Sequence, residues 1–204
     1  MLALALVVLL AAPVEVERVL AVVNGVPVLA SDAELAEIAL LVPREPDESD
    51  ADYRSVVVTA LVDLELRFQD LAAAGVVERT PVDLNKAWSS MLTRAGSEET
   101  LRTRLAGSGF DETALRRLVR RAAVVEAYVA RRFAPFIRPT REEVEQLYQA
   151  EVVDRARAGG LSAPDLPTVR PAIEALLRER KLANEVGRWT DDLARRAEVV
   201  RYIK

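Results

Sequence analysis

The chain has 204 residues, of which 50% are hydrophobic and 29% are charged, as in globular proteins that bury a core. Its 32 acidic and 28 basic residues leave a net charge of −4, which argues against a nucleic-acid partner, because such proteins usually carry a basic surface. Histidine and cysteine are both missing, which excludes Ser-His-Asp and Cys-His catalysis and zinc sites built on those side chains. We therefore expect a protein that is not an enzyme and that has no catalytic residue, metal site or cofactor.

The first residues form an apolar segment, MLALALVVLLAAPV, which ends before Glu15. A membrane-spanning helix needs about 20 apolar residues, whereas the apolar core of a signal peptide has roughly 7–15. We predict that residues 1–13 are a signal peptide, cleaved between Ala12 and Glu15, and that the chain is periplasmic or otherwise exported, with no membrane span after cleavage. A buried strand or helix of the fold is the alternative for this segment.

A β-hairpin is predicted directly after this segment. Two runs rich in β-branched and aliphatic residues, 17–23 and 26–29, flank Asn24-Gly25, and this dipeptide favours tight hairpin turns because both residues tolerate a positive φ. Ser31 is followed three residues later by Glu34, the spacing of a capping box, so a helix is expected to begin there and to reach Leu41.

The rest of the chain has the apolar periodicity of helices and ends in a short strand. Caps at Thr80, Ser97, Asp111 and Thr140 mark four of the helix starts. The predicted helices cover residues 51–74, 80–94, 97–106, 111–133, 140–158 and a last segment from 168–171 to 196, followed by a strand over 198–203.

These elements predict a mostly α fold: a multi-helix domain with a small N-terminal β-hairpin that is joined by a C-terminal strand. We expect one domain over residues 14–204, with the last helix and strand, 168–204, packing back on the rest. A lone two-stranded hairpin is marginally stable in water, so the terminal strand would complete the sheet. Exchange of strands between two copies, giving a homodimer, stays open as an alternative.

Three stretches share features with a known family: VERVLAVVNGVPVLASDAEL (Val16–Leu35), LRTRLAGSGFDETALRRLVRR (Leu101–Arg121) and RRAEVVRYI (Arg195–Ile203). They resemble the SurA-type periplasmic chaperones and their parvulin-linked relatives, and the resemblance covers most of residues 16–148 and 168–204. It implies a chaperone domain that opens with a hairpin and a capped helix. It also implies a function, the binding of unfolded exported polypeptides, notably outer-membrane proteins, as a holdase.

One feature of that family is not matched by this sequence. Members commonly carry a parvulin prolyl-isomerase domain where this chain has only residues 151–168, a segment too short to bury a core of its own. Parvulin sites also use histidines, which this chain lacks. We therefore expect no isomerase activity. The alternatives to a holdase are a helical scaffold or subunit for one dedicated partner and, further from the residues, an isomerase-family member with residual activity.

A holdase needs an apolar crevice rather than catalytic groups, and one helix offers a stripe for it. Trp88, Met91 and Leu92 recur at helical spacing on the predicted helix 80–94, and Phe110 lies beside a glycine between two helices. We take these four residues as the candidate peptide-binding site, with unfolded or partly folded polypeptides as partners. Packing in an ordinary core is the alternative interpretation of the same pattern.

Arginines gather on the predicted helix 111–133, where Arg116, Arg117, Arg120 and Arg121 lie within one arc. Anionic lipid, nucleic acid or acidic polypeptides would be functional partners for such a cluster. We favour a solvated helix face on which these arginines pair with Glu112, Glu126 or neighbouring acids, because the net charge of the chain is negative.

Overall fold

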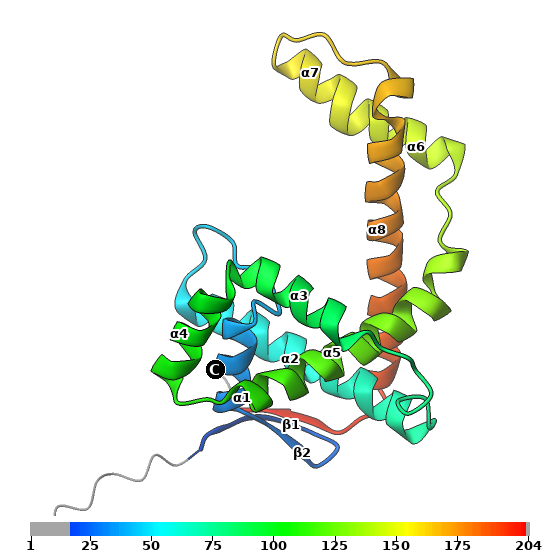
Figure 1. Ribbon diagram of the computed structural model, residues 1–204. Helices are drawn as coiled ribbons and strands as arrows, with labels where there is room; N and C mark the ends of the chain where they lie inside the picture. Colours follow the sequence, from blue (N-terminus) through cyan, green and yellow to red (C-terminus); the bar gives the residue numbers. More distant parts are fainter. Residues whose placement is uncertain (1–16, 203–204) are drawn as a thin grey trace, which may run out of the picture.

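The computed structural model describes residues 17–202 and shows a mostly helical fold with a small antiparallel sheet (Figure 1). The predicted fold class is confirmed, whereas the predicted signal peptide, residues 1–13, lies outside the described part of the chain. The strands are β1 (Val19–Val23), β2 (Val26–Leu29) and β3 (Val199–Arg201). The helices are α1 (Ala30–Ile38), α2 (Asp50–Ala73), α3 (Leu84–Ala95), α4 (Glu98–Ser108), α5 (Glu112–Arg132), α6 (Arg141–Tyr148), α7 (Asp154–Ala158) and α8 (Leu166–Ala194).

The sheet joins the two ends of the described chain. Its strand order is β2-β1-β3, with both neighbours antiparallel to β1, so the predicted union of the hairpin and the terminal strand is confirmed. Asn24 and Gly25 have φ angles of 49° and 81° at the hairpin turn. Asn24 also holds β3 in place: its backbone N–H donates to the carbonyl oxygen of Glu198 at 2.8 Å, and its Oδ1 accepts from the N–H of Glu198 at 2.9 Å.

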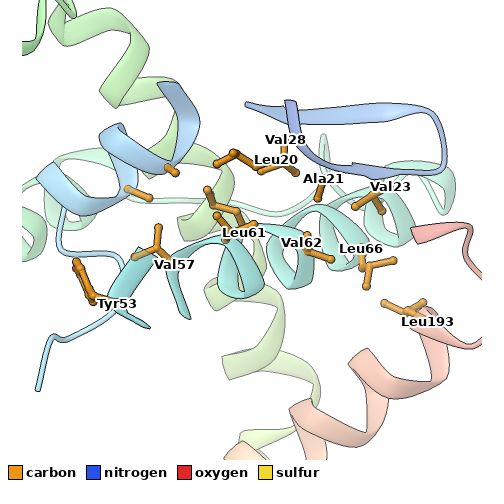
Figure 2. Packing of buried hydrophobic residues seen from close by; sticks show 13 residues of the cluster. Leu20, Ala21, Val23, Val28, Tyr53, Val57, Leu61, Val62, Leu66 and Leu193 are labelled. Carbon is orange, nitrogen blue, oxygen red and sulfur yellow. The ribbon is translucent and has the colours of Figure 1, made fainter. Parts of the chain in front are cut away.

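One face of the sheet packs on α2, and Figure 2 shows the side chains between them. Ala21, Val23 and Val28 from the strands meet Val62 and other apolar residues of α2, and all four are at most 4% exposed. Leu193, near the end of α8, closes the same cluster. A two-stranded hairpin alone is marginally stable in water, whereas three strands with one face covered by a helix form a stable sheet.

Most of the predicted helix caps are confirmed. Ser97 and Asp111 accept from the backbone N–H groups of Thr100 and Ala114, and Thr140 forms the predicted capping box with Glu143. These three starts depend only on residues within one turn of the cap, which is why the sequence predicts them.

Three predicted helix starts are wrong, and the last helix, α8, begins at Leu166 after Asp165 rather than at 168–171. The first helix begins at Ala30, because Asp32 rather than Glu34 accepts from a backbone N–H before the helix, that of Leu29, at 2.9 Å. Thr80 is no cap: its hydroxyl donates to the carbonyl oxygen of Val76 at 2.8 Å, and Asp83 caps α3 instead. At the first helix and at α3, an aspartate takes the role predicted for another residue: Asp32 that of Glu34, and Asp83 that of Thr80.

Helices α6 and α7 and the outer, N-terminal half of α8 form an arm. This arm projects from the body, which consists of α1–α5 and the sheet (Figure 1). Near its C-terminal end α8 is fastened to α2, since Arg67 Nε donates to Thr190 Oγ1 at 2.6 Å and Trp189 Nε1 donates to Asp70 Oδ2 at 3.3 Å. The N-terminal half of α8 runs away from the body, and Leu176 in this half is 37% exposed.

Within the arm, α6 packs against α8. Val144 and Ile173 are buried in this part, and Lys181 Nζ donates to both carboxylate oxygens of Glu143, at 2.6 and 2.8 Å. The hydrogen bond from Lys181, together with that from the Thr140 backbone, lowers the pKa of the Glu143 carboxyl. Stabilisation by this pair is therefore complete above the ordinary carboxyl pKa and is lost as the pH falls through the lowered value.

None of the helices within residues 17–202 has an apolar stretch that could cross a bilayer. That a single domain covers residues 14–204 stays a prediction.

Candidate functional site

An apolar groove of about 280 Å³ lies between α3 and α5. Its floor is the buried Met91 of α3 together with Leu118, Val119 and Ala123 of α5. Further alanines of both helices line it, and their short side chains leave the space that larger residues would fill. The groove thus exists because two amphipathic helices that pack on the core meet through small residues.

Charged side chains of both signs lie around this groove. Asp83 and Lys86 come from the start of α3, Arg94 from its end, and Glu126 from α5. All four residues are exposed, and Asp83 also caps α3 by accepting from the Lys86 N–H at 2.9 Å. A groove with an apolar floor and a rim of both positive and negative charges favours contact with apolar chain segments. It distinguishes little between the sequences of such segments.

The structure brings the four sequence-predicted site residues, Trp88, Met91, Leu92 and Phe110, into one hydrophobic cluster. Within it they have different places. Met91 is 0% exposed and forms part of the groove floor, whereas Leu92 packs on the cluster without lining the groove. Met91 is thus first a packing residue.

Trp88 and Phe110 line a second, smaller pocket of about 190 Å³ beside α4. The guanidinium carbon of Arg116 lies 4.1 Å from the centroid of the Trp88 ring, at a distance where the cation and the aromatic face attract each other. Both aromatic residues are half-buried. They could therefore be reached by a ligand without any rearrangement of the core.

The α5 half of the groove was not identified as a site from the sequence. Leu118, Val119 and Ala122 have the spacing of an ordinary amphipathic helix, and nothing in the pattern says that part of that face stays uncovered. The one available signal is the run of alanines, at 122, 123, 127 and 130, which predicts thin packing at this point of the helix.

Two of the four clustered arginines of α5 pair with acids. Arg116 Nε lies 2.5 Å from Glu112 Oε1, as predicted, whereas Arg121 pairs with Glu65 of α2. Arg117 and Arg120 make no ion pair or hydrogen bond with residues 17–202. The prediction of a solvated, acid-paired face is therefore only half right, because α2 takes one arginine and two stay unpaired in the described chain.

Half-buried carboxyls elsewhere in the fold have structural partners. Burial raises the pKa of Asp32, which caps α1, and that of Asp63, whose carboxylate faces Arg67. Neither residue lines the α3–α5 groove. Among the described residues, no cluster of three or more acidic side chains is arranged to hold a metal ion.

Comparison with models of known protein families gives no match, and no curated protein matches the chain significantly.

Proposed function

We propose that this chain binds unfolded, exported polypeptides and keeps them from aggregating, without catalysing a reaction. The observation that carries the proposal is the apolar groove between α3 and α5, with its floor of Met91, Leu118 and Val119 and its charged rim. An engineered apolar cavity of about 150 Å³ holds benzene, so 280 Å³ has room for one or two apolar side chains of a bound segment.

Several features of the groove suit a partner of variable sequence. Its walls offer methyl and methylene groups, which attract any apolar side chain without requiring a particular geometry. The resemblance of the hairpin and of Leu101–Arg121 to SurA-type chaperones supports the same activity, and the apolar start of the chain supports export. Outer-membrane proteins are the client class that the resemblance suggests.

The proposal predicts that filling the groove weakens binding. Ser90 is exposed on α3 and lines the groove, whereas its neighbour Ser89 is equally exposed but does not line it. Ser90→Trp is expected to raise the concentration of chain needed to suppress aggregation at least about tenfold, which corresponds to about 1.4 kcal/mol of binding free energy. Ser89→Trp adds the same indole to the same helix and should behave like the unchanged chain.

The measurement is light scattering from several unrelated, chemically unfolded proteins diluted into buffer with either variant. Suppression of all of them by the unchanged chain and by Ser89→Trp, with loss in Ser90→Trp, supports the proposal. Equal potency of the two variants would show that the groove does not bind the unfolded proteins. Failure to suppress any of these proteins, combined with tight binding of a single partner, would favour the dedicated scaffold.

A further inference from the structure

A further pocket of about 250 Å³, the α2–α5 pocket, lies where α5 passes the C-terminal half of α2. Its apolar walls are Phe68 of α2, Val77 of the following loop and Val124 of α5. Successive residues of a helix are about 100° apart, so Arg117 and Val124 face away from Val119 and Ala122, which line the α3–α5 groove. The two sites therefore lie on opposite sides of one helix.

Three arginines line the α2–α5 pocket and give it a net positive charge. The Arg121 guanidinium carbon lies 4.6 Å from the centroid of the Phe68 ring, and Arg121 forms an ion pair with Glu65, so its charge is compensated. Arg117 and Arg120 line the same pocket, are exposed, and pair with no acid in residues 17–202. No acidic side chain lines the pocket.

The arginines differ in the donors that a ligand could reach. The Nε–H of Arg121 is enclosed and has no acceptor among the described residues, so a ligand in the pocket does not meet it. The exposed guanidinium groups of Arg117 and Arg120 are the donors that a ligand oxygen would meet. Arginines bind carboxylates strongly because their planar donors match the two oxygens.

We infer that this pocket binds an apolar side chain of a client polypeptide that is flanked by carboxylates, so that the chain prefers acidic, aromatic segments. The size fits, since a cavity of about 150 Å³ holds a benzene ring and this one is about 250 Å³. The unpaired Arg117 and Arg120 at the pocket meet the flanking carboxylates while the ring contacts Phe68, Val77 and Val124. The inference rests on the proposed binding of polypeptides and adds a charge preference to it.

Fluorescence anisotropy with three labelled peptides tests this preference. The peptides share a Gly-Ser frame and differ at the centre, which is Glu-Phe-Glu, Lys-Phe-Lys or Glu-Ser-Glu. The unchanged chain is expected to bind the Glu-Phe-Glu peptide at least about tenfold more tightly than either of the others. Because the contact is between charges at the surface, this preference should shrink as the salt concentration rises.

Two charge-reversed variants locate the site. Arg117→Glu/Arg120→Glu should lose the preference and favour the Lys-Phe-Lys peptide. Arg155→Glu/Arg157→Glu on α7 changes the net charge by the same amount, far from the pocket, and should retain the original preference. Arg117→Gln/Arg120→Gln, a milder change at the same exposed positions, should reduce the preference without reversing it, and circular dichroism checks that each variant is folded.

The outcomes separate this inference from the proposed function. Equal binding of the three peptides, or no binding of the Glu-Phe-Glu peptide up to about 1 mM, overturns the inference even if the chain suppresses aggregation. The inference is also overturned if both charge-reversed variants lose the preference equally. Discrimination among the peptides without any suppression of aggregation would keep the pocket and remove the holdase function.

Discussion

Removal of residues 198–204 is expected to lower the free energy of unfolding by about 3 kcal/mol, because at least three hydrogen bonds beyond the strand ladder are lost, each contributing about 1 kcal/mol. Two of them join Asn24 to Glu198, and the third runs from the Tyr202 N–H to the carbonyl oxygen of Leu20. The deletion also uncovers one side of β1, the central strand. Urea unfolding followed by circular dichroism measures the change.

The control for this deletion is Val200→Thr. Val200 of β3 is 40% exposed and pairs with Val22 of β1, so the substitution keeps the strand and should change stability by less than about 0.5 kcal/mol. The uncovered edge of β1 should also lead the truncated chain to associate, through strand exchange or aggregation, as size-exclusion chromatography would show. A truncated chain that unfolds like the intact one and stays monomeric would contradict the role of β3.

Met91→Ala is expected to lower the free energy of unfolding by about 2–5 kcal/mol, as for other buried methionines cut back to alanine. Met91 is 0% exposed and packs with Leu35, Leu101 and Leu115, so it joins α3 to α1, α4 and α5. Met91→Leu conserves volume and should cost less than about 1.5 kcal/mol. Both variants are compared by urea unfolding.

The pair of variants separates packing from binding at this position. If Met91 only contacted bound polypeptide, Met91→Ala would leave unfolding unchanged and would reduce suppression of aggregation. A fall in stability for Met91→Ala, with near-normal stability for Met91→Leu, agrees with its place beneath the groove. Equal stability of Met91→Ala and the unchanged chain would contradict the packing described here.

The parts of the fold that the sequence predicts are those whose cause is local. Asn24-Gly25 determines its own turn, since both residues adopt positive φ there, and Ser97 and Asp111 cap helices through N–H groups three residues away. The terminal strand was predicted by a stability argument, because a hairpin needs a third strand, and β3 meets that need.

The parts that the sequence does not predict depend on which faces meet. The apolar positions of α8 have the same spacing whether another helix covers them or not, so the projecting arm and the exposure of Leu176 leave no periodic signal. Thr80 reads as a helix cap, yet its hydroxyl bonds to the Val76 carbonyl oxygen and accepts from Arg131, a residue distant in sequence. Such long-range partners decide between equally plausible local choices.

The candidate site shows the same division. Trp88, Met91, Leu92 and Phe110 were grouped from apolar spacing and position, and they do share one cluster. Their exposed fractions differ because of the way α4 and α5 pack around α3. The apolar spacing along α3 does not indicate this packing. Glu65 of α2 pairs with Arg121, while Arg117 and Arg120 have no acid partner among the described residues, and this division depends on how α2 and α5 pack.

Hydrogen–deuterium exchange with and without an unfolded client protein tests most directly whether the α3–α5 groove is where polypeptides bind. If they bind there, exchange should slow in α3 (Leu84–Ala95) and in the facing part of α5 when the client is present, while the arm formed by α6, α7 and the outer half of α8 is unchanged. Protection confined to the arm or to the sheet, with α3 exchanging as in the free chain, would contradict it.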